Sequence, residues 1–406
     1  MSSTPQFIVS HPTGNTFVRA LIEELDKMKK LEKFFTTIGS GKDANDIFKI
    51  FMERRSYSVR DKKIKRLWFP EIRRFFFQKN QTQEKKRQQI DESYTSLDQN
   101  VALNLHYYNA FVIHSYEDAA ACSFKRAKEL GMACSYELPI AYWMNVRKLL
   151  AEEAERFPEW EPTLESTFES EEKLTRKEEE INLADYISCP SQFVLESIPK
   201  EIRQKKPCQI VPFGSPTSPK ISLQKTPRIE KSLKVLFVGS MSQRKGLADL
   251  FEAMKILSQE PVSLSILGQP SMPMEFYRKA YSGFQYFPPC SNEKVRQIML
   301  QHDVLALPSI VEGRALVQQE ALSCGLPIIV TPNAGGQDLV EEGVTGYLIP
   351  PRSPTILAEK ILQLVENIDS LHHQEIACRE KAIAFSWSNY ARKIINFSFY
   401  NSGKSH

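Results

Sequence analysis

Two glutamates stand out in the stretch VEGRALVQQEALSCGLP, which runs from Val311 to Pro327. Glu312 precedes an apolar pattern typical of a buried helix, and Glu320 lies inside that pattern. A core helix gains little from a carboxylate, because a buried charge is costly unless it is paired. A carboxylate does offer two acceptor oxygens, which suit the hydroxyl groups of a sugar. We therefore interpret the stretch as part of a site for a polyhydroxylated ligand.

The same stretch and an earlier loop offer places for negative charge. The first amides of a helix have no intrahelical acceptors and lie at its positive end, so Gly313–Leu316 suits a phosphate group. The loop GSMSQRKG supplies Arg244 and Lys245. A lysine about 4 Å from a phosphate oxygen gains roughly 4 kcal/mol at an effective dielectric of about 20. Together these residues predict a bound diphosphate, with one glutamate for each polyol that flanks it.

Each of these residues also has an ordinary interpretation. Glu312 alone could favour a helix dipole, Glu320 alone could pair with a surface lysine, and Lys245 alone could be a solvated residue at a helix start. It is the combination, in this order and spacing along the chain, that indicates a ligand site.

The elements that must position these residues are most regular in the second half. From about residue 233 to residue 384, runs such as LKVLFVG and VSLSILG alternate with amphipathic stretches such as GLADLFEAMKIL. Near-continuous apolar strands that alternate with helices predict a parallel sheet covered on both faces. Such Rossmann-like sheets bind ligands beyond the carboxyl ends of their strands, where the loops described above are expected to converge.

The first half, residues 1–212, repeats the pattern less regularly. A chain of 406 residues exceeds one ordinary core, so an α/β protein with two Rossmann-like domains is expected. The segment 212–232, rich in Pro, Ser and Lys, is interpreted as the linker to the second domain, 233–384. The last segment, 385–406, is expected to form a helix that packs back on the first domain.

Composition excludes several classes of protein. The seven cysteines form no C-x-x-C pair, so neither a zinc site nor a disulfide framework is indicated, which suits a reducing, cytoplasmic location. No run of about 18 apolar residues is present, so no membrane span is expected. The second half has no evident D-x-D motif, so catalysis is expected to need neither a metal ion nor a cofactor.

Charge is distributed unevenly along the chain. Residues 51–90 carry 13 Lys/Arg and 4 Asp/Glu, interleaved with aromatic residues. This segment is either a surface for anionic membrane or a lipid-linked acceptor, or a solvated pair of helices. Nucleic-acid binding is not expected, because no recognisable binding module surrounds it. Residues 151–186 carry 4 Lys/Arg and 13 Asp/Glu, and are expected to form a solvated helical insertion.

The motifs resemble those of the retaining glycosyltransferases of family 4 (group 1), which have the GT-B fold of two Rossmann-like domains facing a central cleft. The resemblance is specific from about residue 233 to residue 384. It rests on Gly239 before Lys245-Gly246, Pro308-Ser309, Glu312-Gly313 with Glu320, Cys324-Gly325, Gly335-Gly336 and Gly343 with Gly346. It continues more weakly into the first half and fails at residues 40–100.

The resemblance implies a nucleotide-diphosphate sugar as the donor. Lys245 and the amides of Gly313, Arg314, Ala315 and Leu316 would hold the diphosphate. Glu312 would contact the donor sugar and Glu320 the ribose, while Ser291 lies where the family contacts the base. Gly14, after the first strand, would approach the donor phosphates, as would the basic Arg244.

The sequence departs from the family pattern at several of these positions. Ser240 stands where an arginine is usual, and Arg314 stands where an aromatic residue is commoner, so Arg314 could return the lost charge. Ala315 replaces a frequent glycine. Glu137 stands where many members carry a histidine near the reacting sugar. Glu137 is interpreted either as a catalytic group or as an ordinary strand end.

The resemblance implies transfer of a sugar to a hydroxyl acceptor with retention of configuration, perhaps in polysaccharide or glycolipid synthesis. Glu312, Lys245 and Glu137 are the candidate catalytic residues. Two alternatives stay open from the sequence alone. One is a nucleotide-sugar epimerase of the same architecture, and the other is a non-catalytic sugar-binding subunit on a membrane surface.

Overall fold

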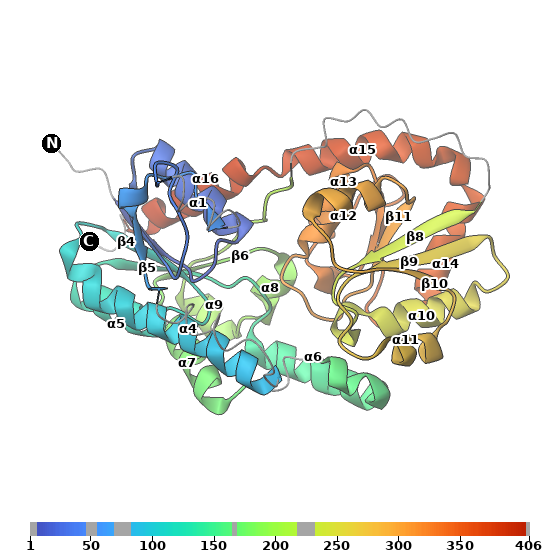
Figure 1. The fold of residues 1–406 in the computed structure, drawn as a ribbon, viewed down its shortest axis with the longest axis horizontal. Helices are drawn as coiled ribbons and strands as arrows, with labels where there is room; N and C mark the ends of the chain where they lie inside the picture. The colour runs from blue at the N-terminus through green and yellow to red at the C-terminus, as the bar shows by residue number, and fades with distance from the viewer. Residues whose placement is uncertain (1–5, 46–54, 69–82, 165–168, 217–231, 403–406) are drawn as a thin grey trace.

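The computed structural model describes residues 6–45, 55–68, 83–164, 169–216 and 232–402. Figure 1 shows two domains, each built around a sheet with helices on its faces. Within the described residues, the strand order is β3-β2-β1-β4-β5-β6-β7 in the first sheet and β10-β9-β8-β11-β12-β13 in the second. All of the pairings are parallel. Both orders reverse beside the first strand of their domain, which is where open α/β sheets bind ligands.

The first sheet is buried on both faces. Phe7 and Val9 of β1 pack with helices α1 and α16, whereas Ile8 packs on the opposite face with α4 and α5. This alternation follows from the two-residue period of a strand. The strands of this sheet are β1 (Phe7–Ser10), β2 (Leu31–Thr36), β3 (Ile64–Arg66), β4 (Val112–Tyr116), β5 (Ala133–Glu137), β6 (Tyr186–Cys189) and β7 (Cys208–Ile210).

The helices of the first half connect these strands and cover the sheet. They are α1 (Thr16–Lys27), η2 (Asp61–Lys63), α4 (Gln83–Asn104), η3 (Leu105–Tyr107), α5 (Ala121–Glu129), α6 (Trp143–Arg156), η4 (Pro158–Thr163), α7 (Glu171–Leu183), α8 (Gln192–Ser197) and α9 (Lys200–Lys205).

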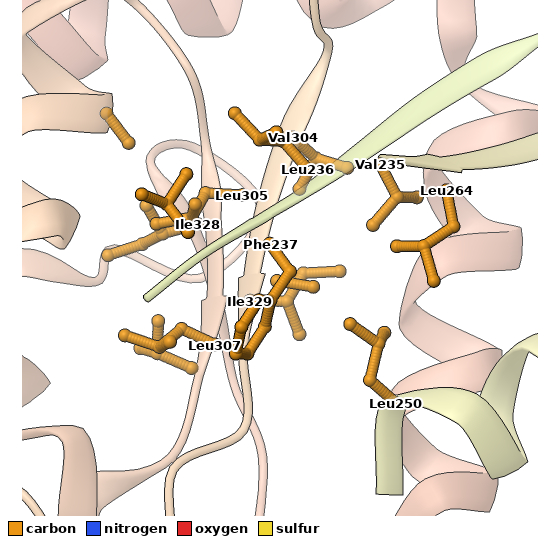
Figure 2. Close-up of a cluster of buried hydrophobic side chains, with 14 of the residues drawn as sticks. Val235, Leu236, Phe237, Leu250, Leu264, Val304, Leu305, Leu307, Ile328 and Ile329 are labelled. Carbon is orange, nitrogen blue, oxygen red and sulfur yellow. The ribbon is translucent and has the colours of Figure 1, made fainter. Parts of the chain in front are cut away.

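The second sheet forms the centre of the largest apolar cluster in the molecule. Figure 2 shows Phe237, Leu305 and Ile328 from neighbouring strands of this cluster, and Leu250 of α10 on the side of the strands opposite Leu305 and Ile328. The near-continuous apolar runs seen in the sequence thus fill both faces of a covered parallel sheet. Its strands are β8 (Leu233–Val238), β9 (Val262–Leu267), β10 (Phe284–Phe287), β11 (Val304–Leu307), β12 (Ile328–Val330) and β13 (Gly346–Leu348).

The helices of the second half end with a return to the first domain. In Figure 1, α15 lies over the second domain and α16 over the first. Tyr390, Ile394 and Ile395 of α16 are buried in the cluster around β1 and α1. The helices are η6 (Gln243–Lys245), α10 (Leu247–Ile256), α11 (Met274–Ala280), α12 (Asn292–Met299), α13 (Leu316–Ser323), η7 (Pro332–Ala334), η8 (Gln337–Leu339), α14 (Pro354–Glu366), η9 (Ile368–Ser370), α15 (Leu371–Ala384) and α16 (Trp387–Ser402).

The expectation of an α/β protein with two Rossmann-like sheets is confirmed. The expectation that the acidic run 151–186 is a solvated insertion is wrong for part of the run, although residues such as Glu159 and Glu172 are exposed. Glu153 and Glu180 in this run are fully buried, and Trp160 is 2% exposed. The two buried carboxylates accept hydrogen bonds inside the protein, as when the amides of Asp118 and Ala120 donate to Glu180. Such bonds offset the desolvation of a buried carboxylate.

The basic segment 51–90 lies in large part outside the described residues, because 51–54 and 69–82 are not among them. Its assignment to a membrane surface or to a lipid-linked acceptor therefore stays a prediction. Of the helices that the structure does describe, none combines the length and the apolar character needed to cross a membrane.

Candidate active site

Two loops meet at the switch point of the second sheet, one after β8 and one after β11. The short helix η6 ends at Gly246, whose φ of 74° lies in the left-handed region that favours glycine. A Cβ atom at Gly246 would lie 2.0 Å from the carbonyl oxygen of Pro308, so a side chain here would force the loops apart. The Ile310 amide donates to the Arg244 carbonyl at 2.9 Å and joins the two loops.

This junction brings together one carboxylate and two cations. The Lys245 ammonium lies 2.5 Å from Oε1 of Glu312, and the Arg244 guanidinium lies 2.8 Å from the same oxygen. Arg244 also donates to the Val311 carbonyl at 3.0 Å. The cluster has one net positive charge at the carboxyl edge of the sheet, where an anionic ligand is expected to bind.

Burial and charge act in opposite directions on these groups. Burial acts to raise the pKa of Glu312, but the charges and hydrogen bonds of Lys245 and Arg244 outweigh burial and hold that pKa below its ordinary value. Burial lowers the pKa of Lys245, and repulsion from Arg244 adds to this effect against the attraction of Glu312. A negatively charged ligand beside Lys245 would favour the charged ammonium.

Glu320 lies one to two turns into α13 and differs from Glu312 in having no recorded partner for its carboxylate in the described part of the chain. Burial raises the pKa of Glu320, and the charge of Arg296 opposes that effect only in part. Burial makes the charged form of this half-buried carboxylate less favourable, and a ligand hydroxyl could donate a hydrogen bond to it.

The amides at the start of α13 are only partly available to a phosphate. Ala315 already donates its amide to the Ala334 carbonyl at 3.1 Å. Leu316 is the first residue of the helix, so its amide has no intrahelical acceptor. Arg314 points elsewhere, because its guanidinium donates to Asp338 at 2.6 Å and to the Gly335 carbonyl at 3.0 Å. In the free protein, Arg314 therefore does not visibly supply the positive charge that is missing at Ser240.

Gly313 joins the second domain to the first. A Cβ atom at Gly313 would lie 1.7 Å from the carbonyl oxygen of Pro139, in the loop after β5. The Ser191 hydroxyl donates to the Gly313 carbonyl at 2.6 Å. Both Pro139 and Ser191 belong to the first half of the chain, and nothing in their local sequence signals this contact. The glycine at this position permits the loops of the two domains to touch.

The other predicted donor-site residues lie in three different loops, and only Ser240 belongs to the two loops described above. Ser240 lies two residues after the end of β8, and its hydroxyl lies 3.2 Å from that of Ser242. Ser291 caps α12 by accepting from the Lys294 amide at 3.4 Å. Gly14 lies in the loop between β1 and α1, where its carbonyl accepts from Arg19 at 2.6 Å.

Glu137 ends β5 in the first domain and is 2% exposed. Its two carboxylate oxygens accept from the Tyr390 hydroxyl at 2.9 and 2.7 Å, and the His114 ring lies 3.3 Å from one of them. Tyr390 belongs to α16, so the returning helix holds Glu137 in place. Glu137 lies two residues before Pro139, which contacts Gly313 of the second domain. The Glu137 carboxylate, however, is hydrogen-bonded inside the first domain.

Comparisons with known proteins agree with this geometry. Residues 220–381, which include both loops and α13, match the family described as glycosyl transferases group 1. The D-inositol 3-phosphate glycosyltransferase of Corynebacterium urealyticum is 29% identical over 182 residues, which is 41% of this chain and 43% of that protein. The chain thus matches less than half of the length of this relative.

Solved structures resemble the chain over nearly its whole length. Sucrose-phosphate synthase from Thermosynechococcus elongatus matches with a TM-score of 0.70 and 18% identity, over 99% of this chain and 100% of that one. HepE from Anabaena, solved in complex with UDP, matches with a TM-score of 0.61 and 16% identity, over 97% of this chain and 99% of that one. The chain therefore has the GT-B fold, and its second domain matches the group 1 glycosyltransferases.

Proposed function

We propose that the protein transfers a sugar from a nucleotide-diphosphate sugar to a hydroxyl acceptor with retention of anomeric configuration. The cluster of Lys245, Arg244 and Glu312 beside the first turn of α13 is the observation that carries the proposal. The match to group 1 glycosyltransferases and the similarity to a structure that holds UDP support it. The Glu320 carboxylate, which has no hydrogen bond within the described residues, would accept from a ribose in the same site.

In this proposal a bound diphosphate shares the two cations with Glu312. Transfer breaks the bond between the anomeric carbon and the diphosphate oxygen, and negative charge grows on that oxygen. Lys245 and Arg244 would stabilise this charge from preorganised positions. As the diphosphate draws on the two cations, Glu312 can accept hydrogen bonds from the donor sugar. To act as a catalytic group on the reacting sugar, Glu137 would have to exchange its hydrogen bonds with Tyr390 for contacts with the sugar.

We also propose that these cations take the part of a metal ion in stabilising the leaving diphosphate. Transfer should then continue at an unchanged rate after exhaustive chelation and without added magnesium or manganese. Strict dependence on either ion would contradict this part of the proposal. The acceptor would be a sugar or lipid-linked hydroxyl of polysaccharide or glycolipid synthesis, and the basic segment 51–90 would bring the protein to anionic membrane.

The test begins with binding, because a ligand that binds only the folded state raises the unfolding temperature by mass action. UDP is the first probe, followed by a panel of nucleotide sugars. NMR of a product formed with a simple hydroxyl acceptor then gives its anomeric configuration. Inversion would overturn the retaining assignment, and epimerised donor would indicate the epimerase. If no nucleoside diphosphate or nucleotide sugar bound, the proposed function would be wrong.

A further inference from the structure

The segment 143–164, made of α6, η4 and Leu164, leaves the first domain and lies against the second. We call it the docking arm. Figure 1 shows α6 extending from the first domain toward α10 of the second domain. At its end, Trp160 is buried in the core of the second domain. The Trp160 ring centroid lies 4.9 Å from that of Phe276 and 5.9 Å from that of Phe251. The docking arm thus belongs to the first domain in sequence, but it is anchored in the hydrophobic core of the second domain.

The docking arm also packs on the loop that carries Glu312. Leu150 and Leu164 of the arm share an apolar cluster with Ile310 and Val311, and all four are fully buried. Because Ile310 and Val311 directly precede Glu312, this cluster fixes the backbone from which the carboxylate extends. Close-packed side chains resist displacement of that backbone.

The arm contacts the other loop through Gln243, which is 0% exposed. The Gln243 amide nitrogen of the backbone donates to the Thr163 hydroxyl at 3.0 Å. Its side-chain amide donates to Glu153 at 2.7 Å and to Asp249 at 2.8 Å, and its side-chain oxygen accepts from the Ala248 amide at 2.9 Å. Two of these partners, Thr163 and Glu153, belong to the arm.

Charge in this buried contact is balanced between the domains. Glu153 of the arm accepts from Arg352 of the second domain, and Asp249 of the second domain accepts from Arg156 of the arm. Each buried carboxylate thus has an arginine from the opposite domain. If either partner moves away, a buried carboxylate is left without a compensating charge. These two ion pairs therefore fix the position of the docking arm on the second domain.

We call residues 239–246, the loop after β8, the phosphate loop. From these contacts we infer that Gln243 is a positioning residue and that the docking arm of the first domain holds the phosphate loop of the second. Gln243 directly precedes Arg244 and Lys245 in η6, so its fixed position sets the place from which both cations reach Glu312. The donor site is then completed by a segment that lies about 80 residues earlier in the chain. The effect on ligand binding rests on the proposed function, whereas the effect on the loop does not.

Two buried threonines offer a matched test. The Thr163 hydroxyl accepts the Gln243 amide and donates to the Trp160 carbonyl at 2.7 Å. The Thr345 hydroxyl accepts the Glu341 amide at 2.7 Å and donates to the Leu339 carbonyl at 2.8 Å. Both are 1% exposed, but Thr345 lies just before β13 and outside the loops of the site. Replacing either with valine removes one hydroxyl and keeps the shape.

Both variants should lose similar thermal stability, whereas only Thr163→Val should weaken UDP binding, by about fivefold, the scale of one lost hydrogen bond. Thr163→Ser keeps the hydroxyl and should restore wild-type affinity. UDP affinity is measured by calorimetry on the full chain. Equal UDP affinity in Thr163→Val and Thr345→Val would overturn the positioning role.

Hydrogen exchange of the free protein tests the loop without any ligand. In Thr163→Val, the Gln243 amide should exchange at least about tenfold faster, because its acceptor is lost. In Thr345→Val, only the Glu341 amide should exchange faster. Unchanged protection around Gln243 in Thr163→Val would overturn the claim that the docking arm holds this loop. If wild-type protein binds no nucleotide and this difference in exchange is still seen, the proposed function fails, but the docking arm still holds the loop.

Discussion

The two glutamates of the candidate site, Glu312 and Glu320, have different surroundings in the free protein. Glu312 is held by Lys245 and Arg244, so its charge is compensated before a ligand arrives. Glu320 is half-buried, and its carboxylate has no hydrogen bond or ion pair within the described residues. Burial raises its pKa, and the charge of Arg296 opposes this only in part. The comparison indicates two ways of preparing a site. In the proposed function, Glu312 would exchange partners when the ligand binds, whereas Glu320 would gain a partner that it lacks in the described part of the free protein.

The largest effect should come from the cation that Glu312 holds. Lys245→Ala removes a preorganised charge beside the leaving diphosphate and should lower turnover by about 100-fold or more. Lys255→Ala is the control, because Lys255 lies on the exposed side of α10, where its ammonium pairs with Glu252 of the same helix. Initial rates with the donor identified by binding give the comparison. Full activity in Lys245→Ala would contradict the assignment of the phosphate loop.

Glu312→Gln should have the next largest effect, and on turnover rather than on UDP affinity. Glu312 would contact the donor sugar, where charge develops as the bond to the anomeric carbon breaks, so turnover should fall by about 30-fold. UDP lacks the sugar, and loss of the competing carboxylate leaves Lys245 and Arg244 free for phosphate. UDP affinity should therefore be kept or improved. Weaker UDP binding in this variant would show that Glu312 contacts the nucleotide itself.

The sequence predicted the second domain well because its signals are local. Continuous apolar strands, glycines at loop ends and the spacing of Glu312 from Glu320 can all be read within short stretches. Both sheets and the junction of the two loops follow from them. The binding of Arg314 to Asp338 was not predicted, because both residues are charged and lie in loops where either could face a ligand.

The docking arm could not be predicted, because its signals are not local. The stretch EEAERFPEWEP has the acidic composition of a solvated helix end, yet Trp160 and Glu153 within it are buried against the other domain. Their partners, such as Phe251 and Arg352, lie far along the chain. Two aromatic residues among charges, Phe157 and Trp160, were the available signal, and they do not identify their partners.

The smallest effect should be on the stability of the free protein. Glu320→Gln removes an unpartnered carboxylate whose pKa burial raises, so the variant should unfold at a temperature on the order of 2 °C higher at neutral pH. A raised carboxyl pKa means that the folded state binds the proton more tightly than the unfolded state. The penalty is therefore present at neutral pH and disappears as pH falls through the pKa of the folded state.

Melting temperatures of wild type and Glu320→Gln should accordingly converge as the pH approaches 4.5, the ordinary value for this group. Glu342→Gln is the control, because the exposed Glu342 pairs with Lys360 at the surface. A lower melting temperature for Glu320→Gln at neutral pH would show that Glu320 already has a stabilising partner in the free protein.

The most direct test of the account compares UDP with uridine on two variants. Glu320 is assigned to the ribose, so Glu320→Gln should weaken both ligands equally, by about 1.5–3 kcal/mol. Lys245 is assigned to the diphosphate, so Lys245→Ala should weaken UDP and leave uridine unchanged. Competition titrations against a tightly bound nucleotide sugar give all four affinities. If Glu320→Gln weakened UDP but not uridine, or Lys245→Ala weakened both alike, the assignment of these residues to the donor would be contradicted.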